Sequence, residues 1–269
     1  MTVVVNSPLS YLGGKSKLAK IIIKGIPHHD KYVEVFAGAA WVLFKKPRSK
    51  VEVINDINSE LVTMYRVLQN HLEEFVRCSE YLLTARDEYN ALRDANPHTL
   101  TDIQRAVRLY FLVKNTFGSK LDFGSFIVPT TRKPRPNPVQ IQEQLKSVRE
   151  RLYGVTIENR PYEQVIKAQD NPNTFFYVDP PYYGCENEYG KGIFARSDFQ
   201  LLRDVLAGCK GKFMMSINNV PYIRELYKDF YIREVSTMYS IAKDESNKVT
   251  ELLITNYDPD TVEPAYPDY

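Results

Sequence analysis

The chain has 269 residues, enough for one large α/β domain or for one domain with a sizeable insertion. Hydrophobic residues make up 43% of it and charged residues 25%, a composition that excludes a disordered or fibrous protein. Its 35 lysines and arginines against 33 acids give a formal charge of +2, so the molecule as a whole is not a polybasic nucleic-acid binder.

The first part of the chain has the pattern of a strand–helix–strand unit. A strand is predicted at Lys31–Phe36, ending at a turn that contains Gly38, and a second strand at 51–56 follows a helix-like segment. A helix is predicted from Ser59 to about Phe75, because apolar residues recur there at helical spacing. Such a unit predicts parallel strands joined by a right-handed crossover.

Residues 84–160 differ in composition from the rest of the chain. They begin with a helical pattern around residues 103–113. The glycines of Phe117–Phe126 then predict a hairpin or looped ribbon, and Pro129–Pro138 is too rich in proline for regular structure. This stretch has 13 lysines and arginines against 8 acids, a net charge of +5, whereas the remainder carries 22 against 25, or −3. A basic insert therefore interrupts a slightly acidic body.

The strand pattern returns after this stretch. Thr174–Val178 and Lys212–Ser216 are predicted strands, and Phe230–Val235 and Glu251–Thr255 are predicted to form a terminal pair. The alternation of strands and helices predicts an α/β fold.

Cysteine usage and the ends of the chain indicate the compartment. Cys78, Cys185 and Cys209 are widely spaced and form no CxxC motif, which favours a reducing environment over a disulfide framework or a zinc site. The N-terminus lacks the features of a signal peptide, and no run of 18 apolar residues occurs. We therefore expect a cytoplasmic protein with no membrane span and no metal.

The strongest motif is Asp179-Pro180-Pro181-Tyr182, directly after a predicted strand. Sites in open α/β sheets lie beyond the carboxyl ends of strands. The exocyclic amine of a nucleobase is a poor nucleophile, and acceptors such as the Asp179 carboxylate and the Pro180 carbonyl would stabilise the positive charge that develops on it. Tyr182 offers a face on which a flipped-out base could stack. The alternative interpretation is a rigid turn with a capping aspartate.

Together with the upstream Phe-x-Gly of Phe36–Gly38, this tetrapeptide resembles the motifs of the Dam-type DNA adenine-N6 methyltransferases. The similarity runs over nearly the whole chain, in that family's order of motifs. It implies S-adenosylmethionine as methyl donor, a Rossmann-like methyltransferase fold with a mixed sheet and helices on both faces, and an inserted helical or hairpin target-recognition domain. The catalytic residues implied are Asp179, Pro180, Pro181 and Tyr182, with Asp179 also contacting the cofactor.

The N-terminal motif Tyr11-Leu-Gly13-Gly14-Lys15 resembles the family's opening segment, which implies that Tyr11, Gly13, Gly14 and Lys15 hold the methionine end of the cofactor. Glycines permit close backbone approach, and a lysine could neutralise a carboxylate. The competing interpretation, a phosphate-binding loop, requires a glycine where this sequence has Leu9.

Further cofactor contacts are implied along the chain. Phe36-Ala37-Gly38-Ala39 fits the family's Phe-x-Gly-x-Gly motif until Ala40 replaces the last glycine. Asp56, 18 residues after Gly38, stands where a Rossmann-type fold places an acid on ribose hydroxyls. Tyr162 would pack on the cofactor's adenine, with a core tyrosine as the alternative. Two later segments, at 216–219 and 251–256, also resemble the family and are interpreted as markers of the fold.

The insert is expected to read DNA. Basic side chains there would meet phosphates, and a ribbon can enter the major groove. An asparagine suits adenine, and an arginine suits guanine. The expected DNA-binding residues are Lys114, Asn115, Lys120, Phe126, Arg132, Lys133 and Arg135.

The sequence therefore predicts a cofactor-binding catalytic domain at 1–80 and 158–269 and a target-recognition domain at 81–157. The predicted activity is site-specific transfer of a methyl group to N6 of a flipped adenine in double-stranded DNA, by a monomer. Two alternatives stay open: the same chemistry on RNA, and a non-catalytic DNA-binding regulator that retains the fold.

Overall fold

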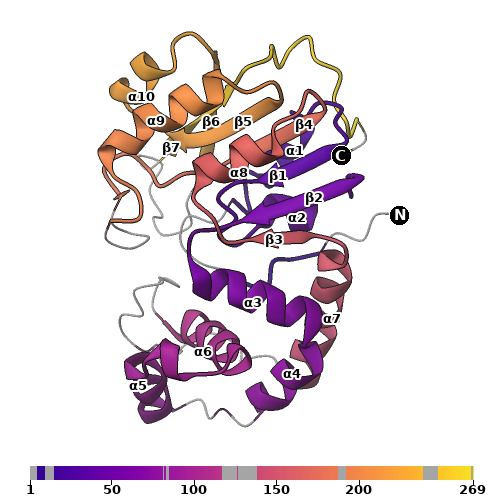
Figure 1. Ribbon diagram of the computed structural model, residues 1–269, viewed down its shortest axis with the longest axis vertical. Coiled ribbons are helices and arrows are strands. Elements are labelled where there is room, and N and C mark those ends of the chain that lie inside the picture. Colours follow the sequence, from indigo (N-terminus) through magenta and orange to yellow (C-terminus); the bar gives the residue numbers. More distant parts are fainter. Residues whose placement is uncertain are drawn as a thin grey trace.

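The computed structural model describes residues 5–9, 15–80, 82, 85–116, 126, 138–186, 192–238, 248–267 and 269. It divides into a sheet lobe and a helical lobe, stacked along the long axis of the molecule (Figure 1). The helical lobe consists of helices α3 to α7, and the sheet lobe contains the sheet and the other helices.

A seven-stranded sheet with the order β3-β2-β1-β4-β5-β7-β6 forms the centre of the sheet lobe. Its strands are β1 (Lys31–Glu34), β2 (Val51–Asn55), β3 (Thr156–Glu158), β4 (Thr174–Val178), β5 (Lys212–Asn218), β6 (Tyr231–Met238) and β7 (Lys248–Thr255). The pairs from β3 to β5 are parallel, and β7 runs antiparallel to both β5 and β6. The mixed sheet predicted from the sequence is confirmed, including the terminal pair.

Both faces of the sheet are covered, as the composition of its central strand requires. Every residue of β4 is buried, and successive side chains of a strand point to opposite faces. Phe175 and Tyr177 accordingly join one apolar cluster, and Phe176 and Val178 join the other. In the sheet lobe, α1 (Ala19–Lys24) and α2 (Trp41–Lys45) contribute to the first cluster. Helices α8 (Tyr162–Gln169), α9 (Arg196–Ala207) and α10 (Pro221–Leu226) contribute to the second.

The helical lobe contains α3 (Ser59–Asn70), α4 (Leu72–Glu80), α5 (Arg86–Asp94), α6 (Asp102–Asn115) and α7 (Pro138–Leu152). The sequence predicted one helix from Ser59 to about Phe75, but the helix is interrupted at His71, whose φ of −133° and ψ of 37° are not helical. The predicted helix around residues 103–113 is confirmed as α6, which begins with a capping box formed by Thr101 and Gln104.

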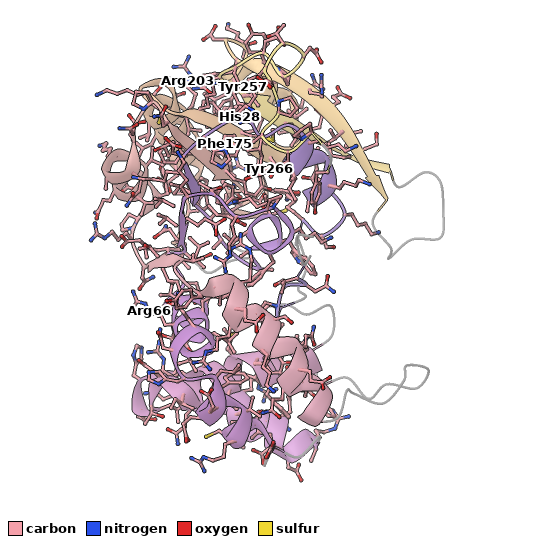
Figure 2. The ribbon with its side chains drawn as sticks, turned by 90° about the vertical axis from the view of Figure 1, so that its right-hand side faces the viewer. His28, Arg66, Phe175, Arg203, Tyr257 and Tyr266 are labelled. Carbon is pink, nitrogen blue, oxygen red and sulfur yellow. The ribbon has the colours of Figure 1, made fainter. Side chains whose placement is uncertain are left out.

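Helices α3 and α4 pack against α6 and α7. Residues 59–80 thus share a helical bundle with part of the segment that the sequence analysis assigned to the insert, and one apolar cluster runs from the sheet into this bundle. At the junction of the lobes, Arg66 of α3 donates a hydrogen bond to the carbonyl of Ile157, 3.2 Å away (Figure 2). The division into domains at 80 and 158 stays a prediction.

Most of the predicted ribbon at 117–126 and most of the proline-rich segment at 129–138 lie outside the described residues. At their margins, Thr116 and Phe126 form an isolated antiparallel bridge, and α7 begins at Pro138. Within the described part of the chain, no helix is long and apolar enough to cross a bilayer.

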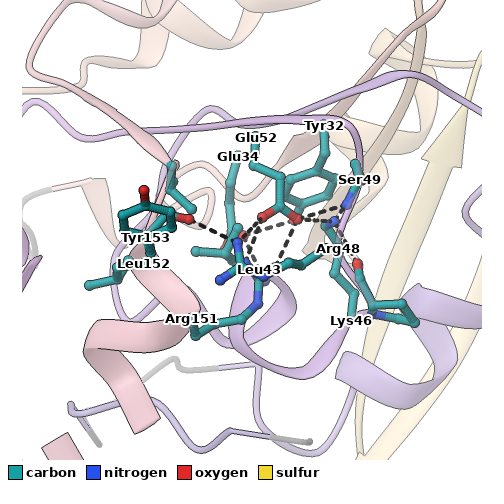
Figure 3. Close-up of polar contacts among 12 residues, drawn as sticks. Tyr32, Glu34, Leu43, Lys46, Arg48, Ser49, Glu52, Arg151, Leu152 and Tyr153 are labelled. Atoms are coloured by element: carbon teal, nitrogen blue, oxygen red, sulfur yellow. Dashed lines mark hydrogen bonds and ion pairs between the residues drawn. The ribbon is translucent and has the colours of Figure 1, made fainter. Parts of the chain in front are cut away.

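A buried ionic cluster joins the end of α7 to the sheet (Figure 3). Glu52 of β2 accepts two hydrogen bonds from Arg151, at 2.5 and 2.8 Å, and one from Lys46, at 2.6 Å. All three side chains are at most 5% exposed. Since buried charges need compensating partners, this cluster holds the last turn of α7 against β2.

Candidate active site

A cavity of about 430 Å³ opens at the carboxyl ends of β1, β2 and β4. Parallel strands direct their carboxyl ends to the same edge of the sheet, so loops that are distant in sequence meet there. The cavity is lined by Lys15, residues 34–42, residues 55–58, Leu61, residues 160–163, Tyr177, Asp179, Pro181, residues 192–194 and Asp198.

The turn after β1 forms one wall of the cavity. Gly38 has a φ of 49°, and Ala40, the N-cap of α2, has a φ of 50°. A left-handed conformation is favourable for glycine and costs an alanine roughly 1–2 kcal/mol. The chain therefore keeps at Ala40 the backbone conformation that suits the glycine of the Phe-x-Gly-x-Gly motif.

Asp56 connects this turn to the end of β2. One carboxylate oxygen accepts a hydrogen bond from the amide of Gly38 at 2.8 Å, and the other accepts one from the amide of Asn58, also at 2.8 Å. Burial raises the pKa of Asp56, and these amide hydrogen bonds oppose the rise. A carboxylate retains further acceptor positions after two hydrogen bonds, so Asp56 can also accept from a hydroxyl in the cavity.

An aromatic cluster of Phe36, Tyr162 and Phe194 forms a further part of the cavity lining. The ring centroids of Phe36 and Tyr162 are 5.5 Å apart, and Phe194 lies 6.1 Å from Phe36 and 5.9 Å from Tyr162. Tyr162 is only 9% exposed, and its hydroxyl donates to the carbonyl of Asp198 at 3.4 Å. This surface could receive a flat apolar ring.

Asp179 follows β4 directly and is held from two sides. Its Oδ1 lies 2.9 Å from Lys15 Nζ and accepts a hydrogen bond from the Ser216 hydroxyl at 3.0 Å. The Lys15 ammonium also donates to the Tyr182 hydroxyl at 2.7 Å. Burial raises the pKa of Asp179, while Lys15 and Ser216 act to lower it. The carboxylate keeps 19% exposure, so it remains reachable from outside.

The loop after Asp179 is fixed to the end of β5. The Tyr183 amide donates to Asn218 Oδ1 at 2.9 Å, and Asn218 Nδ2 donates back to the Tyr183 carbonyl at 3.0 Å. The Tyr183 ring stacks on Tyr222 with a centroid separation of 4.8 Å. These contacts orient the Asp-Pro-Pro-Tyr segment at the edge of the sheet.

The structure brings all of the described cofactor candidates into this cavity. Lys15, Phe36, Ala37, Gly38, Ala39, Asp56, Tyr162 and Asp179 all line it, with Pro181. Tyr11, Gly13 and Gly14 lie outside the described residues, as do Lys120, Arg132, Lys133 and Arg135.

The three described DNA candidates occupy different environments. The Lys114 side chain is exposed and its ammonium lies 5.4 Å from the Tyr110 ring centroid. Asn115 is only 1% exposed, and its amide donates to the Phe111 carbonyl at 2.6 Å, so in this arrangement it faces the helical lobe's interior. Phe126 is half-buried, with its ring centroid 5.3 Å from that of Tyr89.

Sequence reasoning did not assign two buried acids at the site, Glu34 and Glu251. Glu34 is 2% exposed and accepts hydrogen bonds from the Tyr32 hydroxyl at 2.8 Å and the Leu43 amide at 3.0 Å. Glu251 is fully buried, with Oε2 3.4 Å from Lys15 Nζ. Both could have been noticed in the sequence, because each is an acid within a mostly apolar predicted strand, and such strands are buried.

Comparison with known proteins identifies the family of this chain. Residues 11–241 match the family model of the D12 class N6 adenine-specific DNA methyltransferases. The chain belongs to this family.

Relatives of this methyltransferase match it over nearly their whole length. The chain is 31% identical to the type II methyltransferase M1.LlaDCHI of Lactococcus lactis subsp. cremoris, over 92% of this chain and 94% of that protein. It is 27% identical to the type II methyltransferase M.CviBI of Paramecium bursaria Chlorella virus NC1A, with coverage of 93% and 98%. It is 24% identical to a DNA adenine methylase of Escherichia coli, with coverage of 96% and 97%. The family predicted from the Asp-Pro-Pro-Tyr and Phe-x-Gly motifs is confirmed, and this protein is a DNA adenine methyltransferase.

Glu34 makes the stability of the methyltransferase depend on pH. Burial raises its pKa to about 8 from an ordinary 4.5, with the hydrogen bonds from Tyr32 and Leu43 opposing. The folded state therefore binds a proton that the unfolded state releases, and the free energy of unfolding falls as the pH rises from 4.5 to about 8.

Glu34→Gln is expected to flatten this dependence and to stabilise the fold above about pH 8 by on the order of 5 kcal/mol. The amide keeps an acceptor for both donors but cannot ionise. Urea unfolding of the two proteins across this pH range provides the measurement. An unchanged slope in the variant would contradict a buried, protonated Glu34.

Proposed function

We propose that this enzyme transfers a methyl group from S-adenosylmethionine to N6 of an adenine flipped out of double-stranded DNA. The observation that carries the proposal is the Asp179 carboxylate, held beside Lys15 at the end of β4 and facing a cavity that also contains Asp56 and an aromatic surface. An N6 amine requires acceptors for its hydrogens, and this carboxylate stands next to a cavity large enough for a nucleoside-sized donor.

The lining residues fit the chemical groups of S-adenosylmethionine. Asp56 would accept hydrogen bonds from the ribose hydroxyls, and Phe36 and Tyr162 would contact the adenine ring. Lys15, with the preceding Tyr11, Gly13 and Gly14, would hold the methionine end. Ala37, Gly38 and Ala39 would allow the backbone to approach the ligand closely. When bound, this cofactor supplies a methyl group activated by a sulfonium sulfur.

The protein's part in the reaction is to make the N6 lone pair available and to stabilise the charge that follows. The Asp179 carboxylate and the Pro180 carbonyl would accept the two amino hydrogens, which localises the lone pair on nitrogen. Pro181 limits the rotation of this segment, and Tyr182 would stack on the target base. Extrusion of the base from the duplex is required, because N6 cannot reach Asp179 from inside a base stack.

DNA contacts in this proposal come from residues 81–157, which would act as the target-recognition insert. Lys114, at the end of α6, has an exposed side chain that would meet a phosphate. Lys120, Phe126, Arg132, Lys133 and Arg135 stay predictions for this role. A base contact by Asn115 would first require its buried side chain to leave the Phe111 carbonyl.

The substrate class is tested by offering the purified protein radiolabelled S-adenosylmethionine with duplex DNA, single-stranded DNA or RNA of the same base sequence. Label should enter the duplex DNA faster than the other two acceptors. Preferential labelling of RNA would support the alternative substrate. Sequence-specific DNA binding with no label transfer to any acceptor would support a non-catalytic regulator.

Asp56→Ala is expected to weaken S-adenosylmethionine binding by about 10- to 100-fold, because a hydrogen bond to a charged group contributes roughly 1.5–3 kcal/mol. The affinity is measured by isothermal titration calorimetry. Asp30→Ala is the matched control, since this aspartate is paired with Lys50 on the surface and is remote from the cavity lining. Equal affinity of the Asp56 variant and the wild type would contradict the assignment.

A further inference from the structure

Glu251 is an acid in an unusual position, on a strand with neighbours on both sides. It pairs with Asn218 of β5 and with Val235 of β6, and its side chain has no exposure. Because β7 is antiparallel to β5, its first residues reach the sheet edge where Asp179 lies. Burying a carboxylate is costly unless a positive group compensates for it. Its position therefore requires an explanation.

The compensating group is Lys15, which Asp179 also contacts. Lys15 Nζ is 3.4 Å from Glu251 Oε2 and 2.9 Å from Asp179 Oδ1, and its side chain is 4% exposed. The same ammonium donates to the Tyr182 hydroxyl. Two carboxylates thus share one ammonium, and this trio has a net charge of −1 when all three groups are ionised.

We propose that Glu251 is a positioning residue for methyl transfer: it holds the Lys15 ammonium between two carboxylates, so that Lys15 orients Asp179 and Tyr182 without fully neutralising Asp179. This inference rests on the proposed function. When N6 gains positive charge in the reaction, a site of net negative charge stabilises that charge better than a neutral ion pair. In an isolated Lys15–Asp179 pair, the ammonium would neutralise the carboxylate, which would then attract the positive charge on N6 less strongly.

The charged and polar groups around Asp179 change its pKa, which can be measured. Lys15 and the Ser216 hydroxyl lower the pKa of Asp179, and Glu251 raises it. The Tyr177 hydroxyl lies 2.8 Å from Ser216 Oγ on the same side. On β1, the buried Glu34 also interacts with Asp179, since the charge of Asp179 contributes to its raised pKa.

Glu251→Gln is expected to lower the maximal rate of methyl transfer by about tenfold, the equivalent of one pKa unit of electrostatic stabilisation. It should also move the acid limb of the pH–rate profile, the fall of the rate as Asp179 is protonated, to lower pH. Removal of a negative charge lowers the pKa of Asp179. Because Lys15 also holds the cofactor in the proposed function, the rates are compared at saturating S-adenosylmethionine, so that a change in its affinity does not enter them. Single-turnover rates as a function of pH, with calorimetry for the affinity, measure all of these quantities.

A double-mutant cycle with Lys15→Met tests whether Glu251 acts through the lysine. Lys15→Met alone should slow transfer and move the acid limb to higher pH, because it removes a positive charge. Adding Glu251→Gln to that variant should return the acid limb towards lower pH and cause no further loss of rate. It should also raise the melting temperature, because the carboxylates of Asp179 and Glu251 no longer repel each other.

Glu52→Gln serves as the matched control, since Glu52 is also buried and ion-paired but lies outside the cavity lining. It should lower the melting temperature and leave the acid limb where it is. The inference is wrong if the wild type transfers methyl groups and Glu251→Gln shows the acid limb of its pH–rate profile at the same pH as the wild type. If Glu251→Gln does not fold, Lys15→Met is compared with the Lys15→Met/Glu251→Gln double variant, and an acid limb at the same pH in these two proteins would also refute the inference. An inactive wild type would instead refute the proposed function.

Discussion

Asp179→Asn is expected to reduce the rate of methyl transfer by about 10²–10³-fold, the loss typical of a pre-organised group that stabilises transition-state charge. Asparagine has nearly the shape of aspartate, but it carries no negative charge and can turn donor hydrogens towards N6. It also loses the ion pair with Lys15, which is 2.9 Å long in the wild type. The side chain keeps 19% exposure in the wild type, so the substitution leaves no fully buried polar group without access to water.

The change is measured as the single-turnover rate with saturating DNA and cofactor, so that binding does not limit it. Asp204→Asn is the matched control, because Asp204 lies on α9 with 55% of its side chain exposed and does not line the cavity. It should transfer methyl groups at the wild-type rate. An Asp179→Asn variant as fast as this control would exclude Asp179 from the chemistry.

Glu52→Ala is expected to destabilise the fold by about 3–5 kcal/mol, the cost of breaking a buried ion pair by removing one partner. The side chains of Lys46 and Arg151 are 0% and 5% exposed, so both cations would lose their shared carboxylate while remaining away from water. Burial already lowers the pKa of Lys46 to about 8, and Glu52 counteracts this effect. The variant should therefore favour a neutral Lys46 and loosen the end of α7.

Urea unfolding followed by circular dichroism measures this loss. Glu74→Ala provides the comparison, because Glu74 forms an exposed ion pair with Arg77 on α4 and such pairs contribute at most about 1 kcal/mol. A loss for Glu52→Ala no larger than that of Glu74→Ala would show that the buried cluster does not stabilise the junction between the lobes.

Local sequence patterns predicted six of the seven strands of the sheet and missed the edge strand β3, Thr156–Glu158. Thr174–Val178 is a short apolar run followed by a proline pair, and it forms β4 with those boundaries. The helix predicted from Ser59 to about Phe75 failed at His71, because apolar spacing continues through a residue that leaves the helical conformation. The helices on the two sides of the break, α3 and α4, both pack against α6 and α7, and periodicity in one segment contains no information about such packing.

The site could be predicted where a motif lies in a strand-end loop. Asp56 and Asp179 were found in this way, and both line the cavity. Glu251 was interpreted only as part of a fold marker, because its contact with Lys15 joins residues 236 positions apart in the chain. The direction of the Asn115 side chain likewise follows from the packing of the helical lobe, whereas its sequence context only indicated a polar residue at a helix end.

The central claim, methylation of adenine at N6 in DNA, is tested most directly by identifying the modified nucleoside. Duplex DNA is incubated with the enzyme and S-adenosylmethionine, digested to nucleosides and analysed by mass spectrometry. We predict N6-methyldeoxyadenosine as the product with the wild type, and at least about a hundredfold less of it with Asp179→Asn at equal times. Methylated cytosine in place of methylated adenine, or no methylated nucleoside across DNA of diverse sequence, would contradict this account.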